Sequence, residues 1–308
     1  MGTHIGTFTL IFQLAFDLLG LVSNGYITFQ GVKDLVKMRS LPPCEKLLSS
    51  LSFINLCLQL ATTSSNLCYY FWPQVLNTEF VPKFFFGTGL FLVSTSLWIS
   101  TWFSVFCSIK IVNKQQKPLM WLQKHMPVLV NWLIIGSVLI GMVQSLSEIN
   151  DLYVRYRNIT DNHGNFSVIP IGLQSRCFCT FWINLLIISE AFILFLIATL
   201  TILCSLWIHV KNMKRRSNIL GNPKFGKLAR AARTVSSLLF LCITFYLVQC
   251  LLYMNVAQYG TLLHTICMIF ISMFPAMNAI ILIIGNQNLK RPVDDFRNKL
   301  CCKCNKDI

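Results

Sequence analysis

Seven long apolar segments, separated by shorter polar ones, run along the whole chain. They cover roughly residues 5–32, 47–71, 84–110, 128–147, 181–208, 234–256 and 262–285. Each has at least about 20 residues, the length that a helix needs to cross the ~30 Å hydrocarbon core of a bilayer. The pattern therefore predicts an all-α membrane protein, with a bundle of seven spanning helices over residues 1–285.

Residues 286–308 are predicted to form a tail outside this bundle. Its first part mixes Leu289, Val293, Phe296 and Leu300 with basic residues. That mixture is typical of a short amphipathic helix that lies on a membrane surface.

Positive charge is concentrated in alternate loops. The segments 33–46, 110–127 and 209–233 and the tail carry 22 of the 26 Lys and Arg residues, and the loops on the other side carry four. Basic loops remain on the cytoplasmic side of a membrane. We therefore expect a multi-pass protein of the plasma membrane with an extracellular N-terminus and a cytoplasmic tail. This topology also explains the net charge of +15, together with anionic lipid at the inner leaflet, so no nucleic-acid partner is expected.

Composition supports a membrane protein and gives no sign of an enzyme. The chain is 55% hydrophobic and 12% charged, whereas soluble domains average about 25% charged residues. The sequence contains no Gly-rich phosphate loop, no HExxH motif and no nucleophile elbow. We therefore expect a non-enzymatic protein that needs no cofactor and no metal.

The largest segment on the expected outer side, 148–180, reads as a polar loop. It holds two glycosylation sequons, at Asn158 and Asn165, although a sequon can also arise by chance. Cys177 and Cys179 in this loop and Cys68 near the outer end of the second span could form one disulfide. The sequence does not decide the pairing.

A second group of cysteines lies in the tail, where Cys301, Cys302 and Cys304 stand among lysines. Cysteines beside a basic patch next to a membrane span are typical palmitoylation sites. A zinc site is the alternative, but no fourth ligand lies nearby in the sequence.

Polar side chains inside the predicted spans are candidates for function, because charge within a bilayer is costly. Asp17 and Glu190 are ionisable. Glu190 could bond to a neighbouring helix, contact a ligand or act in a switch. Neutral polar residues accompany them, namely Asn24, Asn55, Asn184, Asn278 and Gln249. For Asn24, Asn55 and Asn278 we favour a packing role, since asparagine side chains often hydrogen-bond between helices.

Aromatic residues form a second candidate group. Trp98 and Trp102 are four residues apart and share a helix face, and Phe245 and Tyr246 lie midway along the sixth span. Aromatic walls with a few polar groups suit a pocket for small amphipathic ligands. Alternatively, these rings belong to the bundle core or to the aromatic belts at the membrane surface.

Several runs of residues occur in an order that is specific to one family. They are Asn24-Gly25-Tyr26-Ile27, the run 98–111 that begins Trp98-Ile99-Ser100-Thr101, Cys204-Ser205-Leu206-Trp207-Ile208-His209, Arg230-Ala231-Ala232-Arg233-Thr234-Val235, and the run 281–290 that contains Gly285-Asn286. Together they span nearly the whole chain, which resembles the bitter taste receptor family (taste receptors type 2).

The chain departs from that family's pattern at several positions, so it resembles a divergent member. The family's helix-two arginine falls on Asn55, its helix-three tyrosine on Cys107, its helix-five proline on Ala191, its helix-six histidine on Leu228 and its helix-seven His-Ser pair on Asn278-Ala279. In place of the arginine, Asn24, Asn55 and Asn278 could form a neutral network at a lower desolvation cost.

The resemblance implies a ligand pocket in the outer half of the bundle, entered between helices two, three, five, six and seven. Trp98 matches the family's pocket tryptophan and Phe245 its helix-six aromatic switch, while Trp102 replaces a commonly polar residue and should narrow the pocket. Weaker wall candidates are Asn66, Thr95, Ile99, Asn184, Gln249 and Met268. The expected packing and switching group is Asn24, Asn55, Glu190 and Asn278.

The resemblance also implies a G-protein-coupled receptor that detects bitter-type small amphipathic molecules. The expected partner is a heterotrimeric G protein with a gustducin-like or other inhibitory-class Gα and βγ. It would contact the inner loops at Lys110, Lys114, His209, Lys214, Arg230 and Arg233. A vomeronasal pheromone-type receptor is the alternative, although the helix-six and helix-seven runs favour the bitter family. A transporter would show internal repeats and a charged path, and the sequence shows neither.

Overall fold

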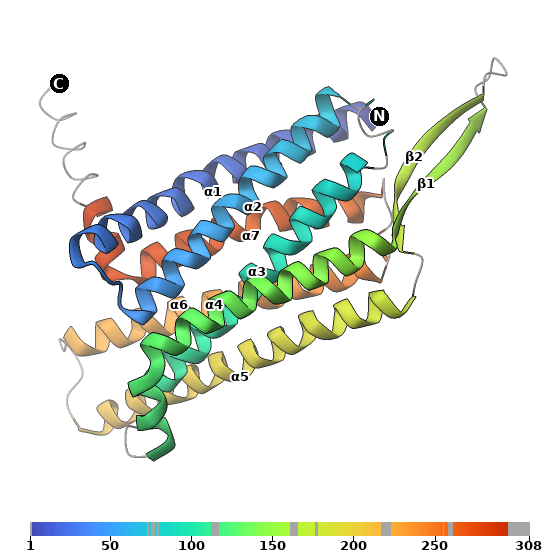
Figure 1. Cartoon of the computed structure of the whole chain (residues 1–308). Helices are drawn as coiled ribbons and strands as arrows, with labels where there is room; N and C mark the ends of the chain where they lie inside the picture. The colour runs from blue at the N-terminus through green and yellow to red at the C-terminus, as the bar shows by residue number, and fades with distance from the viewer. Residues whose placement is uncertain are drawn as a thin grey trace, which may run out of the picture.

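Seven long helices run side by side and form one bundle in the computed structural model (Figure 1). They are α1 (Gly2–Met38), α2 (Pro43–Phe71), α3 (Phe80–Ile111), α4 (Lys117–Asp151), α5 (Phe178–Arg216), α6 (Pro223–Tyr253) and α7 (Leu262–Gly285). The structure describes residues 2–72, 74, 78, 80–111, 117–160, 166–175, 178–216, 223–254, 256–257 and 261–294. Within these ranges it leaves out the side chains of 2–7, 69, 117–124, 152, 154–160, 166–175, 178, 181, 209, 212–216, 223–229 and 253.

Each of the seven helices contains a span of 23 to 32 residues that is long and apolar enough to cross a membrane. The chain is therefore a multi-pass membrane protein with seven spans, as the hydropathy pattern predicts. A short helix over 287–294 follows α7 and confirms the helix predicted for the tail. The Tyr26 hydroxyl donates to the carbonyl of Leu289 (2.8 Å) and joins this short helix to α1.

The segment 148–180 holds a β hairpin, which the reading of this segment as a loop did not foresee. α4 continues to Asp151, and β1 (Leu152–Thr160) then pairs antiparallel with β2 (Phe166–Ser175). Both strands are rich in β-branched and aromatic residues, and the Asn-His-Gly run 162–164 lies between them. Asn158 lies on β1 with its side chain undescribed, and Asn165 lies outside the described residues.

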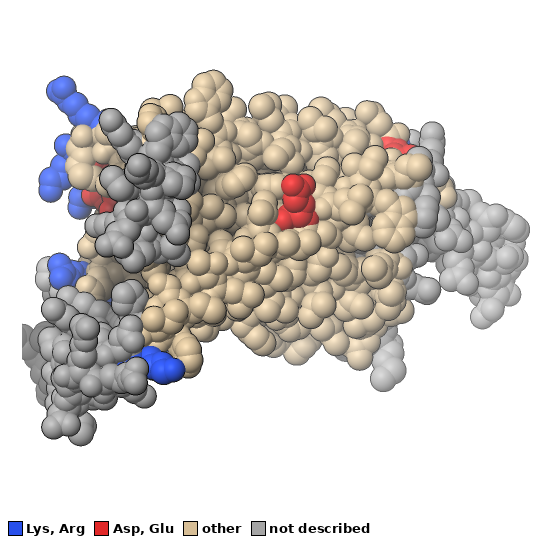
Figure 2. Space-filling model, turned by 90° about the horizontal axis from the view of Figure 1, so that it is seen from below, with Lys and Arg blue, Asp and Glu red and all other residues tan. Residues whose placement is uncertain are grey.

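The two ends of the bundle differ in charge. The hairpin projects from one end, here named the hairpin end, and the helix over 287–294 lies at the other, here named the basic end (Figure 1). On the face drawn in Figure 2, Lys and Arg side chains gather at the basic end and the middle is almost uncharged. Large apolar side chains that face outward from the middle, such as Trp132 and Phe240, are more than half exposed. Such a surface suits contact with lipid tails.

α3 is the central helix, and its span is more deeply buried than the other six. It packs against α2, α4 and α5. Its buried face is rich in small polar residues, including Ser94, Thr95, Ser96, Ser100 and Thr101. Small residues let helix backbones approach closely inside a membrane, which explains how one helix can contact three others.

Apolar clusters fill the space between the helices at successive levels. A cluster toward the basic end contains Ile27, Leu47, Leu51, Ile99 and Leu282. A middle cluster contains Leu58, Val93, Phe195, Phe245 and Phe274, and a smaller one toward the hairpin end contains Val248, Ala257 and Cys267.

Gly141 lies at a close approach of α4 to α3. A Cβ atom at this position would come within 2.9 Å of the backbone carbonyl oxygen of Phe91 and would also press on the side chain of Thr95. Gly136, five residues earlier on α4, has open space instead, with no atom within 4 Å of its Cβ position.

Gly141→Ala should therefore destabilise the bundle by about 1–3 kcal/mol, because backbone cannot yield to the added methyl group. Gly136→Ala is the matched control on the same helix, and it should be neutral or stabilising by up to ~1 kcal/mol through helix propensity. The thermal unfolding midpoint of the detergent-solubilised protein measures both changes. Equal midpoints for the two variants would contradict the close packing of α3 on α4.

Candidate functional site

Aromatic rings from α3, α5, α6 and α7 stack in the interior of the bundle. Trp98 and Trp102 share a face of α3, as their spacing predicts, with ring centroids 5.7 Å apart. Phe245 of α6 stacks on Phe274 of α7 at 4.0 Å. The first pair lies within α3, and the second joins α6 to α7.

A third stacked pair joins α5 to α6. The rings of Phe192 and Tyr246 lie nearly parallel, with centroids 4.1 Å apart. The hydroxyl groups of Tyr246 and Ser189 form a hydrogen bond of 2.8 Å. α6 therefore contacts both of its neighbours through aromatic side chains.

The predicted pocket residues lie at different depths. Trp98 lies about 27 Å along α3 from its start, past the midpoint of this 32-residue helix, and is 6% exposed. Phe245 lies in the half of α6 nearer the hairpin end and is also buried. Asn66 and Gln249 are half-buried, and Met268 is exposed, all three toward the hairpin end. Trp98 and Phe245 therefore lie deeper in the bundle than Asn66, Gln249 and Met268, and the third predicted aromatic contact, Trp102, lies about one turn beyond Trp98.

Two of the predicted wall residues, Thr95 and Asn184, contact α4, and a third, Ile99, lies in a core cluster shared by several helices. The Thr95 hydroxyl donates to its own helix at Phe91 (2.8 Å) and lies against Gly141 of α4. Ile99 is fully buried in the cluster that also contains Val130 of α4. Asn184 is fully buried and donates a short hydrogen bond to Glu148 of α4. Thr95 and Asn184 therefore contact α4, whereas the cluster around Ile99 also contains Ala279 and Leu282 of α7.

A polar network joins α3, α4 and α5. The Ser94 hydroxyl donates to Gln144 Oε1 (2.6 Å), and Gln144 Nε2 donates to the backbone carbonyl of Asn184 (3.4 Å). The Asn184 side chain then donates to Glu148, which is 4% exposed. This network was not predicted, because Glu148 lies one residue beyond the predicted span of 128–147. The four-residue spacing of Gln144 and Glu148, which puts both on one helix face, is the signal that could have found it.

A second polar group lies between α1, α2 and α7. Asp17 is fully buried and accepts hydrogen bonds from the hydroxyl groups of Thr62 (3.4 Å) and Thr63 (3.1 Å). Gln59, also fully buried, donates to the backbone carbonyl of Ser272 on α7 (3.2 Å). These bonds supply partners for polar groups that have no access to water in the membrane, while Gln59 Oε1 is buried with no partner among the described residues.

The asparagines of the predicted network have separate partners. Asn24 donates to the carbonyl of Pro275 (3.2 Å), so it joins α1 to α7. Asn55 accepts a hydrogen bond from Ser96 (2.6 Å), so it joins α2 to α3. Asn278 is buried on α7. The described hydrogen bonds of Asn24 and Asn55 therefore connect neighbouring helices, and neither goes to another asparagine of the three.

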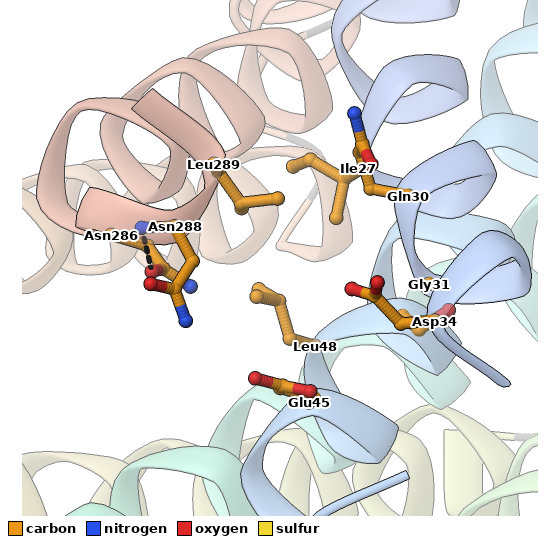
Figure 3. A pocket seen from close by; sticks show the side chains of 10 residues that line it. Ile27, Gln30, Gly31, Asp34, Glu45, Leu48, Asn286, Asn288 and Leu289 are labelled. Carbon is orange, nitrogen blue, oxygen red and sulfur yellow. Dashed lines mark hydrogen bonds between the residues drawn. The ribbon is translucent and has the colours of Figure 1, made fainter. Parts of the chain in front are cut away.

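A small cavity of about 50 Å³ opens at the basic end between α1, α2 and the residues that follow α7 (Figure 3). The carboxyl groups of Asp34 and Glu45 line it together with the amide groups of Asn286 and Asn288. The backbone N–H of Asn288 donates to Asn286 Oδ1 (3.0 Å). This acidic cavity was not predicted, because the positive charge of the surrounding loops dominates the sequence pattern there.

The structure describes the side chains of only some of the residues predicted to contact a G protein. Lys110, Arg230 and Arg233 are exposed there, near the ends of α3 and α6. His209 and Lys214 lie on α5 with undescribed side chains, and Lys114 lies outside the described residues, as do Cys301, Cys302 and Cys304.

Comparison with known proteins identifies relatives over the whole chain. The family model described as "Taste receptor protein (TAS2R)" matches residues 1–301. Taste receptor type 2 member 119 of Rattus norvegicus is 27% identical over 308 residues, which cover 99% of this chain and 89% of the relative. Taste receptor type 2 member 41 of Gorilla gorilla gorilla is 30% identical over 237 residues, 76% of each chain. Taste receptor type 2 member 40 of Gallus gallus is 24% identical over 94% of each chain.

The contact between Asn184 and Glu148 should make the two residues strongly interdependent. Asn184→Ala leaves a buried carboxyl group without its described donor and should destabilise the protein by about 2–4 kcal/mol. Adding Glu148→Leu to that variant should restore part of the loss, because no polar group is then left unpaired. Thermal unfolding of the wild type, both single variants and the double variant measures this coupling. Strictly additive losses would show that the two residues do not interact.

Proposed function

The chain belongs to the TAS2R family and is a G-protein-coupled bitter taste receptor, and from this premise we propose where its ligand binds and how the signal leaves the bundle. The ligand is a small amphipathic molecule of the bitter type, and it binds in the half of the bundle nearer the hairpin end. The stacked Phe245–Phe274 pair between α6 and α7 is the observation that supports this site best.

The pocket extends from the hairpin end down to the aromatic rings. Asn66, Gln249 and Met268 lie on its upper wall, and Phe245 and Trp98 lie at its base. Trp98 and Phe245 are only 6% and 4% exposed, so a ligand reaches them only when α6 or its side chains shift. A ligand that binds the shifted arrangement more tightly increases its population, which is how binding activates the receptor.

Contacts beyond Phe245 supply a route from the ligand to α7 and α1. Phe274 stacks on Phe245, and the next residue, Pro275, has no N–H to donate within α7. The carbonyl of Pro275 accepts the hydrogen bond of Asn24 on α1. A displacement of Phe245 therefore acts beside Pro275, where α7 lacks one backbone hydrogen bond and where the hydrogen bond of Asn24 joins α1 to α7.

The basic end faces the cytoplasm in this proposal, and the N-terminus and the hairpin lie outside the cell. The support is the concentration of Lys and Arg at the basic end. The G protein, with a gustducin-like or inhibitory-class Gα, contacts this end near Lys110, Arg230 and Arg233, with Lys114, His209 and Lys214 in the same loops. Palmitoylation of Cys301, Cys302 and Cys304 would attach the tail to the inner leaflet of the plasma membrane.

A calcium-mobilisation screen tests the proposed function. The full chain is expressed in cells with a gustducin-chimaeric Gα, and a panel of bitter compounds and steroid-like amphipaths is applied. A saturable response that requires the Gα supports the proposed ligand class and partner. A response that requires a different Gα would reject the gustducin-like partner while leaving the pocket to be tested.

Phe245→Ala and Trp98→Ala should each raise the agonist concentration for half-maximal response roughly 5- to 150-fold, since truncating a buried aromatic contact costs ~1–3 kcal/mol of binding. Trp132→Ala is the matched control, because Trp132 faces outward from α4 and is 68% exposed. Surface expression is measured for every variant, and Trp98→Phe tests the position with less disturbance of packing. Unchanged dose–response curves for Phe245→Ala and Trp98→Ala would reject the pocket.

The proposed orientation makes the hairpin accessible to the glycosylation machinery. Asn158→Gln and Asn165→Gln should each remove one glycan from the mature protein, and the double variant should no longer change mobility after treatment with peptide N-glycosidase. The change in gel mobility of the wild type and the three variants measures this. A wild type that is insensitive to the enzyme, with an N-terminal epitope detected only in permeabilised cells, would reverse the orientation.

A further inference from the structure

Glu190 presents a carboxyl group to the outside of the bundle within the span of α5. Its side chain is exposed, whereas Ile188 and Ala191 beside it face the core. It lies about 12 Å along the helix from Trp182, where the span begins. Acidic atoms are visible in the middle of the otherwise uncharged belt in Figure 2. Among the residues that the structure describes, no hydrogen bond or ion pair satisfies this carboxyl group.

Two other carboxyl groups within the spans are buried and hydrogen-bonded, unlike that of Glu190. Asp17 and Glu148 are buried, and each accepts hydrogen bonds from a neighbouring helix. A polar group that faces hydrocarbon without a partner is costly, and lipid tails cannot supply one. Another protein chain that crosses the membrane beside α5 can supply a partner for Glu190 at the same depth.

The residues that share this face of α5 form a continuous apolar stripe. Steps of three and four residues connect Ile183, Leu186, Glu190, Ile193, Ile197 and Leu200, and the next steps reach Cys204 and Trp207. The aliphatic members are each 50–66% exposed, and Cys204 is exposed as well. Alternating steps of three and four are the repeat by which two parallel helices pack side by side, with one polar residue fixing their alignment. The outward faces of α4 and α6 have similar steps, but no carboxyl group at mid-span among their described residues.

We propose that this stripe of α5 is the contact surface between two copies of the receptor, aligned by a hydrogen bond between their two Glu190 side chains. All copies cross the membrane in the same direction, so two α5 helices in contact are parallel. A two-fold axis normal to the membrane then brings each residue of the stripe against its counterpart in the other copy. Glu190 is thus guaranteed a polar group at its own depth, which no other membrane partner guarantees.

The hydrogen bond needs one proton between the two carboxyl groups. One group, carrying its proton, donates through its O–H to an oxygen of the other. No further ligand is required, and a Gln side chain at this position could form an equivalent amide pair. The inference is independent of where the agonist binds.

Native Cys204 supplies a direct test, because it lies 14 residues, or two repeats, after Glu190 on the same stripe. Membranes that contain the full chain are oxidised with copper-phenanthroline, and the products are separated without reductant. We expect a disulfide-linked dimer that Cys204→Ser abolishes. In the Cys204→Ser background, Ile197→Cys should restore the cross-link, and Leu196→Cys should not, since it lies at the same depth but is rotated by about 100°.

Two outcomes of the cross-linking experiment would overturn the proposal. The first is a dimer band that persists in Cys204→Ser and moves instead with Val143→Cys on the outward face of α4. The second is a cross-link from Cys204 to a protein of different mass, which would assign the stripe to another membrane protein.

Substitution of Glu190 tests its role in the alignment. Counting of single labelled receptors over a range of surface densities should show association that is roughly three- to thirty-fold weaker for Glu190→Leu than for the wild type. Glu190→Gln should keep most of the association. Because the side chain faces outward, both variants should reach the surface normally, which surface labelling checks. Association of Glu190→Leu equal to that of the wild type would reject the carboxyl pair.

Discussion

Water is absent from the hydrocarbon core of a bilayer, and the interior of this bundle is arranged around that constraint. A polar side chain in a span must find its hydrogen-bond partner on another helix or within its own. Asn24 therefore bonds to α7, Asn55 to α3 and Asn184 to α4. Each bond contributes only about 0.6–2 kcal/mol, but each has a defined direction. Together they fix which helices are neighbours and how each is rotated about its axis.

Burial of apolar surface cannot supply this specificity, because lipid tails are as apolar as the helix surfaces that they would replace. Close contact between helix backbones supplies this specificity instead. Gly20 lies against Gln59 of α2, Gly87 against Ile149 of α4 and Gly285 against Thr234 of α6. In each case an added Cβ atom would overlap with the neighbouring side chain. The small side chains of α3 have the same effect at the centre of the bundle. Polar bonds and small residues thus act together, since a short hydrogen bond between helices requires backbones that can approach.

Hydropathy was sufficient to predict the seven spans, because the length of an apolar segment is a property of the sequence alone. The hairpin was missed because its strands are short and their signal is weak beside those of the spans. Rotation of the helices was harder still. A helix that is apolar all round has little contrast between its faces, so the sequence did not show that Thr95 lies against α4 or that Glu190 faces outward. Asp17 and Glu190 read alike in the sequence, and only the packing of the other helices separates a buried carboxyl from an exposed one.

The contacts of α7 show how a signal could pass through so tightly bonded an interior. α6 and α7 touch through Phe245 and Phe274 in the middle and through Thr234 and Gly285 at the basic end. The upper contact adjoins Pro275, where the helix lacks a backbone donor and where Asn24 is attached. The lower contact adjoins Asn286, which lines the acidic cavity. A shift of α6 at the aromatic level therefore cannot stay local, because the same two helices meet again where the receptor would contact its G protein.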